Sequence, residues 1–177
     1  DGKVLDPDGI PVCTKAGVQA LPRVAWDGKA FQIVWQDYRS NERYEVYGAR
    51  VSPEGKVLDV DGNLLATQKD RHRYAPAIAP AGDGRNTMIW NGDIRFGTGT
   101  IAGGVFLAEG KAEKAVAWDS NARKQGPGYE FVPLCLAKGP KNYLVAWTTD
   151  NTIGRDPRAG ATNASILDAD GARGISL

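Results

Sequence analysis

The chain has 177 residues, with 22 basic and 21 acidic side chains and a formal net charge of +1. Hydrophobic residues make up 42% and charged residues 24%, which is typical of a globular protein with a real core and excludes a disordered chain. The near-zero charge gives no general attraction to nucleic acid, and no apolar run reaches the roughly 20 residues of a membrane helix. With 22 glycines and 10 prolines, the sequence favours strands and turns over helices.

The first predicted elements are two strands joined by a glycine-containing turn. They occupy residues 22–35 and end at Trp35, after which a polar loop follows. Residues 44–52 alternate between apolar and polar side chains, as a half-buried strand does. The turn at residues 53–55 then leads to a fourth strand, which we expect to start within residues 56–59.

The same pattern returns twice along the chain. Residues 76–90 and 133–147 repeat the order of strand, turn and strand. The repeats end in tryptophans that are spaced by 55 and 57 residues: Trp35, Trp90 and Trp147. The second halves of the later units are looser: 102–110 and 160–171. Self-similarity at a fixed period predicts an array of structural repeats.

The spacing divides the chain into a single domain of repeat units at about 14–66, 67–120 and 121–177. The opening sequence DGKVLD also matches EGKVLD at residues 54–59 almost residue for residue. We therefore expect residues 1–13 to supply the closing strand of a four-stranded unit. The chain begins without Met and cuts the repeat in mid-unit, so we expect a processed product or a part of a longer protein.

The first unit resembles a repeat of large secreted bacterial proteins. That repeat reads PxVAWDG, then F/Y-x-VVWxDxR, then YGARVSPxGxVLD; residues 22–66 follow it closely and residues 1–12 match its tail. Such repeats resemble β-propeller blades of four antiparallel strands. The resemblance implies an all-β fold of about three propeller-like blades in a secreted or periplasmic protein. It implies no particular function, because propellers host lectins, lyases, scaffolds and enzyme subunits alike.

Three blades are fewer than the roughly four to eight that close a propeller. Either a second copy of the chain or another propeller-forming chain completes a ring, or the chain is part of a longer propeller, or the fold is different. The alternative fold is a β-trefoil, which also has three units and often carries a Gln-x-Trp signature. Gln32-Ile-Val-Trp35 has the wrong spacing for that signature, and the other units lack the glutamine.

The polar loops after the repeat tryptophans are the first candidate ligand site. Their charged residues are Asp37 with Arg39, Asp93 with Arg95, and Asp150. An aromatic wall beside a carboxylate and a guanidinium suits a sugar or a carboxylate ligand. A structural role fits the same residues, because a repeated Trp commonly packs between blades and a repeated Asp–Arg pair commonly ties blades together.

A basic loop before the second unit is the other candidate site. It contains Arg71, His72 and Arg73, and in a propeller it opens on the same face as the loops after the tryptophans. A positive, aromatic-lined face favours an anionic ligand such as an acidic glycan, whereas a solvated loop needs no ligand at all. Nucleic acid fits poorly, because no binding motif occurs and the isoelectric point is only about 7.9.

Metal and cofactor chemistry finds little support in the sequence. Asp-x-Asp-Gly recurs at residues 6–9, 59–62 and 168–171, but the further ligands of an EF-hand calcium loop are absent, and Asp and Gly are ordinary turn residues. Cys13 and Cys135 lack metal-site spacing, and the sequence leaves a disulfide between them open. We therefore expect no cofactor and no bound metal.

These observations favour a non-catalytic binding or interaction module whose partner is a glycan or a protein. One alternative is a carbohydrate-active enzyme, a polysaccharide lyase or glycosidase, because lyases combine a cation with a His or Tyr base. Its residues to test would be Tyr38, Arg71, His72 and Tyr74. A further alternative is a structural subunit of a larger complex, which predicts a large apolar face where missing blades would pack.

Overall fold

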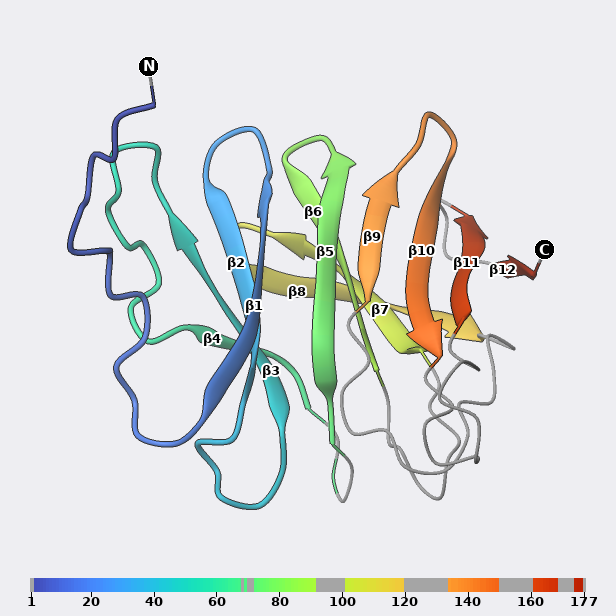
Figure 1. The fold of residues 1–177 in the computed structure, drawn as a ribbon, viewed down its shortest axis with the longest axis horizontal. Coiled ribbons are helices and arrows are strands. Elements are labelled where there is room, and N and C mark those ends of the chain that lie inside the picture. The colour runs from blue at the N-terminus through green and yellow to red at the C-terminus, as the bar shows by residue number, and fades with distance from the viewer. Residues whose placement is uncertain are drawn as a thin grey trace.

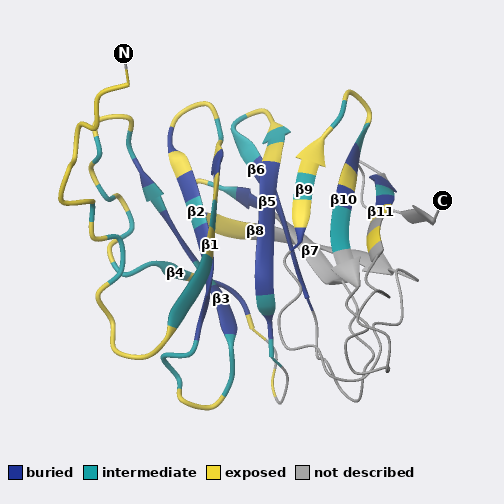
Figure 2. Ribbon diagram, in the orientation of Figure 1, coloured by how far each residue is buried: buried dark blue, intermediate teal, exposed yellow. Residues whose placement is uncertain are grey.

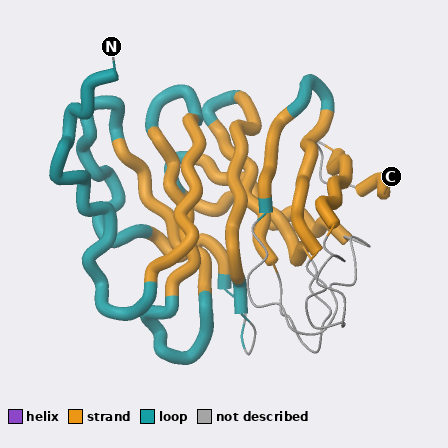
Figure 3. Tube along the Cα trace, in the orientation of Figure 1, coloured by secondary structure: helices purple, strands orange, loops and turns teal. Residues whose placement is uncertain are grey.

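A computed structural model describes residues 2–67, 69, 72–91, 101–119, 134–149, 161–168 and 174–176. This part of the chain consists of strands and loops (Figure 3). Within it, no helix is long and apolar enough to cross a membrane. The strands form three four-stranded antiparallel sheets, so the prediction of an all-β fold built from four-stranded units is confirmed.

Each sheet is built from four strands that are consecutive in the chain. Blade 1 consists of β1 (Gln19–Trp26), β2 (Phe31–Asp37), β3 (Glu45–Val51) and β4 (Asn63–Ala66). Blade 2 consists of β5 (Tyr74–Gly82), β6 (Arg85–Asn91), β7 (Ile101–Ala108) and β8 (Lys111–Asp119). Blade 3 consists of β9 (Cys135–Lys138), β10 (Asn142–Thr149), β11 (Ala161–Asp168) and β12 (Gly174–Ser176).

The three blades stand side by side in a row, with β5 packed between β1 and β9 (Figure 1). The two ends of the chain lie at opposite ends of this row. Stacked sheets of consecutive antiparallel strands are the arrangement of propeller blades. The β-trefoil alternative is therefore wrong.

Two apolar layers hold the blades together. The layer between blades 1 and 2 contains Ala25, Val34, Val46, Leu65, Ala66, Ile78, Met88, Trp90 and Leu107. The layer between blades 2 and 3 contains Ala77, Ala79, Ile89, Leu134, Tyr143, Val145 and Leu167. Successive side chains of a strand point to opposite faces, so neighbours such as Ile89 and Trp90 serve different layers. Strands β5 and β6 of the middle blade are accordingly buried along much of their length (Figure 2).

The N-terminal segment differs from the sequence-based expectation. Residues 2–13 form no strand, and every sheet already has four strands of its own. The segment instead lies against the outer side of blade 1, where Ile10 and Val12 line grooves together with Ile33 and Trp35. The expected closing strand is therefore absent, and the segment packs on the face of blade 1 instead of pairing with a strand.

The fourth strand of blade 1 also begins later than residues 56–59. Val57 makes only an isolated bridge to Val51, and β4 starts at Asn63. Between them the chain turns sharply, because the amide of Gly62 donates a hydrogen bond of 3.1 Å to the carbonyl of Asp59. Asp59 also accepts hydrogen bonds from Arg50, which holds the turn against β3.

Gly62 provides a direct test of this turn. Its φ is +78°, and a Cβ at this position would lie 2.7 Å from Cζ2 of Trp35. We expect Gly62→Ala to lower the free energy of unfolding by about 2–3 kcal/mol, because left-handed backbone strain adds to the overlap with a buried ring. Urea denaturation measures this change, with Gly28→Ala as the control because its φ is also positive but nothing lies within 4 Å. Equal losses in the two variants would contradict the packing argument.

Candidate functional site: the loop end of blade 1

The candidate loops meet at one end of blade 1. The loop between β2 and β3 and the linker from β4 to β5 both lie at the lower end in Figure 1. The amide of Arg73 donates to the carbonyl of Tyr44 at 2.9 Å, and the amide of Tyr44 donates to Nδ1 of His72 at 3.0 Å. These two bonds join the loops, so the expectation that they open on one face is confirmed at this blade.

Four aromatic side chains gather at this end, which we call the aromatic loop cluster: Tyr38, Tyr44, His72 and Tyr74. The rings of His72 and Tyr74 stack with centroids 5.2 Å apart and an interplanar angle of 16°. Tyr44 lies 5.3 Å from Tyr74 and 4.8 Å from Tyr38. All four side chains are half-buried, so each presents part of its surface to solvent.

The hydrogen bond at His72 fixes which tautomer the ring adopts. Its Nδ1 accepts the Tyr44 amide proton and so must carry a lone pair. In a neutral imidazole the other nitrogen, Nε2, then bears the hydrogen. His72 is thereby arranged as a hydrogen-bond donor through Nε2. The nitrogen that could act as a base, Nδ1, already accepts the hydrogen bond from the Tyr44 amide.

Asp37 and Arg39 form a tight pair on the other side of the same loop. The carboxylate of Asp37 is fully buried and accepts bonds from Nη2 of Arg39 at 2.6 Å and from Nε1 of Trp35 at 2.9 Å. Burial raises the pKa of Asp37, but the hydrogen bonds from Arg39 and Trp35 outweigh it and hold this pKa below its ordinary value. The pair is therefore charged, and the Asp37 carboxylate is enclosed by the protein.

Arg39 also connects three separate parts of blade 1. Its Nη2 donates to Sγ of Cys13 at 3.3 Å and to the carbonyl of Asp61 at 2.9 Å. Its guanidinium carbon lies 3.8 Å from the ring centroid of Tyr47. These contacts fix the N-terminal segment and the β3–β4 loop to the sheet. The structure thus gives the Asp37–Arg39 pair a structural role within one blade.

The remaining predicted site residues fall into two groups. Arg73 is buried, and its guanidinium carbon lies 6.0 Å from the Trp90 ring between blades 1 and 2. The others lie outside the described residues and stay predictions: Arg71, Asp93, Arg95 and Asp150. Sequence reasoning placed Tyr44 in a strand and missed its role in the cluster. The sequence did contain a signal for this role, because Tyr44 directly precedes the strand that begins at Glu45 and therefore lies at the end of the β2–β3 loop.

The Asp-x-Asp-Gly sequences form turns where the structure describes them. The amide of Gly9 donates to the carbonyl of Asp6 at 3.0 Å, like the pair at residues 59–62. Among the described residues, no group of three or more His, Cys, Asp or Glu side chains could hold a metal ion. Cys13 and Cys135 are both free thiols.

Comparisons with known proteins identify the fold. No protein-family model and no curated protein sequence matches the chain. The structure is similar to a neuraminidase-like protein from A/bat/Guatemala/164/2009, with 9% identity and a TM-score of 0.53, over 92% of this chain and 42% of that one. It is also similar to a subtype N10 neuraminidase-like protein of A/little yellow-shouldered bat/Guatemala/060/2010, with 11% identity and a TM-score of 0.52, over 94% and 47%.

At such low identity, the likeness concerns the fold alone. The three sheets match part of neuraminidase-like β-propellers. The chain spans less than half the length of these solved structures.

Proposed function

We propose that the chain is a binding module on a propeller scaffold, and that it binds an oligosaccharide at the aromatic loop cluster. The observation that carries the proposal is the gathering of four half-exposed aromatic side chains at one end of blade 1, from the β2–β3 loop, the β4–β5 linker and the first residue of β5. Aromatic rings offer an apolar face to the C–H groups of a sugar, and the Tyr38 hydroxyl and the His72 N–H offer hydrogen bonds to its hydroxyl groups.

The hydrogen bond to His72 favours binding over catalysis. A lyase base must accept a proton, whereas Nδ1 of His72 already accepts the Tyr44 amide. The stacked His72 and Tyr74 rings have the geometry of packing rather than of a proton relay. The carbohydrate-active enzyme remains the alternative, and Arg71, its expected cation, lies outside the described residues.

Tyr38→Ala tests the proposal with two probes, tetragalacturonate and the neutral maltotetraose. Isothermal titration calorimetry with the unmodified chain is expected to detect binding of at least one of them. Tyr38→Ala is expected to weaken that binding about tenfold, which corresponds to the loss of one ring contact of about 1.4 kcal/mol. Leu58→Ala is the control, because Leu58 is an exposed apolar side chain in the β3–β4 loop, at the end of blade 1 opposite the β2–β3 loop.

Three outcomes would contradict the proposal. The first is that neither probe binds. The second is that Tyr38→Ala binds as tightly as the unmodified chain. The third is that Leu58→Ala weakens binding as much as Tyr38→Ala does. Appearance of unsaturated sugar products during the titration would support the lyase alternative instead.

A further inference from the structure

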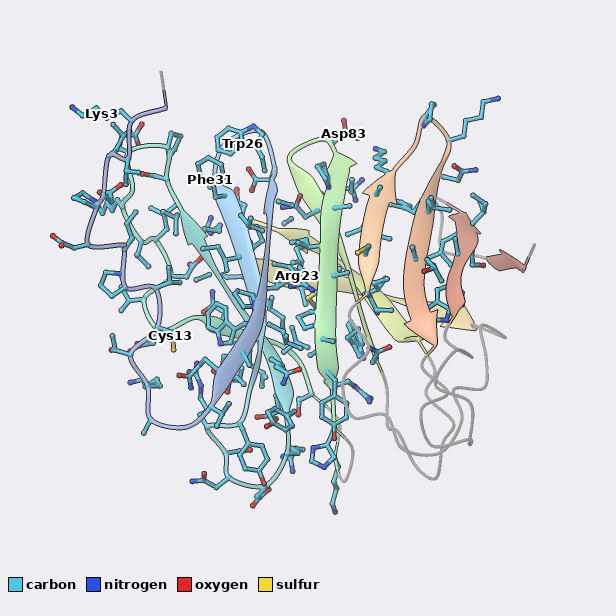
Figure 4. All side chains as sticks on the ribbon, in the orientation of Figure 1. Lys3, Cys13, Arg23, Trp26, Phe31 and Asp83 are labelled. Carbon is cyan, nitrogen blue, oxygen red and sulfur yellow. The ribbon has the colours of Figure 1, made fainter. Side chains whose placement is uncertain are left out.

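Both ends of the row of blades present apolar side chains without a neighbouring blade. At one end, the open face of blade 1 consists of Val24, Trp26, Phe31 and Ile33. Val24, Trp26 and Phe31 are 60%, 40% and 43% exposed, and the last two rings lie 4.9 Å apart (Figure 4). At the other end, the open face of blade 3 includes Leu144, Ala146 and Ile166, of which Leu144 is 43% exposed. Exposed apolar patches of this kind mark interaction sites.

The repeat register shows that these two faces are complementary halves of one interface. Aligning the units on Trp35, Trp90 and Trp147 places Phe31 at the position of Tyr143, and Leu144 at the position of Thr87. Tyr143 and Thr87 meet between blades 2 and 3. The Thr87 hydroxyl donates to the Tyr143 hydroxyl oxygen at 2.8 Å, and both side chains are almost fully buried.

The same alignment covers the rest of both faces. Ile33 occupies the position of Val145, which packs on the preceding blade, and Ala146 occupies the position of Ile89, which packs on the following one. Blade 1 therefore exposes the side that receives a preceding blade, and blade 3 exposes the side that receives a following blade. Repeat arrays that end in solution carry polar outer faces, whereas apolar side chains lie at the centre of each of these two faces.

We propose that a second copy of this chain closes the ring, with blade 3 of each copy packing on blade 1 of the other. Two such contacts related by a two-fold axis close completely and give six blades, which is within the usual range for propellers. The neuraminidase-like structures that the fold resembles are six-bladed, and this chain covers 42% and 47% of their length. By register, Phe31 of one copy packs against Leu144 of the other.

The N-terminal segment occupies part of this interface in the single chain. Residues 10–13 cover the Trp35 end of blade 1, and a groove of about 530 Å³ separates the segment from Val24 and Phe31. Polar contacts at its base hold it, including the bond from the Asp61 amide to the Val12 carbonyl. In the ring, blade 3 of the second copy replaces this segment as the cover of blade 1.

Sedimentation equilibrium of the unmodified chain tests the proposal first. The mass is expected to rise with concentration and to level off at twice the monomer mass of 19.0 kDa. A mass that stays at 19.0 kDa at every concentration would overturn the second copy as the occupant and would point to blades that lie outside this sequence. A mass that keeps rising beyond the dimer would overturn ring closure, because only an open interface polymerises.

A charge swap then tests the predicted contact. Phe31→Glu and Leu144→Lys are each expected to weaken dimerisation by at least about 100-fold, because each buries an unpaired charge. Mixing the two variants is expected to restore a dimer, since one interface then pairs the new Glu with the new Lys and the other keeps Phe31 with Leu144.

Leu58→Lys is the matched control, because Leu58 is also 43% exposed but lies in the β3–β4 loop. It is expected to dimerise like the unmodified chain, and circular dichroism spectra verify the fold of every variant. A mixture that stays monomeric, or single variants that dimerise normally, would overturn the Phe31–Leu144 contact.

Discussion

Replacing Trp35 by alanine is expected to lower the free energy of unfolding by about 3–5 kcal/mol. The side chain is only 4% exposed, and its Nε1 donates to the Asp37 carboxylate at 2.9 Å. The substitution removes a large buried ring and leaves Asp37 without one of its donors. Chemical denaturation measures the loss.

Trp26→Ala is the matched control for this prediction. Trp26 lies on the neighbouring strand of the same blade but is 40% exposed in the single chain, so its removal is expected to cost the monomer less than about 1 kcal/mol. An unchanged stability of Trp35→Ala, combined with lost oligosaccharide binding, would instead make Trp35 part of the ligand surface.

Asp37→Asn is expected to lower the free energy of unfolding by about 3 kcal/mol at neutral pH. The substitution keeps the size of the side chain but leaves the guanidinium of Arg39, which is 17% exposed, without its counter-charge. The contacts that Arg39 makes to Cys13 and Asp61 are expected to loosen as well, because the pair orients that guanidinium.

The same variant tests the acid response of the fold. Burial raises the pKa of Asp37, but the hydrogen bonds from Arg39 and Trp35 lower it by more, so the pKa of Asp37 in the folded chain is below its value in the unfolded chain. Between these two pKa values the unfolded chain binds more protons than the folded chain. The stabilisation from Asp37 is therefore complete above the unfolded pKa and is lost as the pH falls through the folded pKa.

Denaturation between about pH 2 and pH 6 separates the two states of Asp37. Asp37→Asn is expected to lose less stability than the unmodified chain as the pH falls. The control is Asp83→Asn, because Asp83 is exposed at the turn between β5 and β6. Parallel pH curves for the unmodified chain and Asp37→Asn would contradict the buried-pair interpretation.

The repeat made most of the fold predictable from the sequence. The strands that contain Trp35, Trp90 and Trp147 return at a regular spacing, and the strand predicted at residues 44–52 alternates, so local pattern and repetition agree. The short strand β4 was misplaced, because the residues after Gly55 carry strand-forming side chains, whereas the bond from Gly62 to Asp59 turns the chain there.

The candidate site was predictable only in part, for reasons of tertiary structure. The loop composition singled out Tyr38 and His72, and the propeller topology correctly placed them at one end. The partners of Arg39 were not predictable, because Cys13 reaches it from the N-terminal segment, 26 residues away in the sequence. No local pattern reveals that this segment lies on blade 1 instead of forming a strand.

The most direct test of the ligand-binding account is a nuclear magnetic resonance titration of the isotope-labelled chain with tetragalacturonate and maltotetraose. We expect the largest chemical-shift changes at the amides of Tyr38 and Tyr44 and at the His72 ring, with little change at Trp26 and Phe31 at the other end of blade 1. Shifts confined to Trp26 and Phe31, or no shifts with either sugar, would contradict the account.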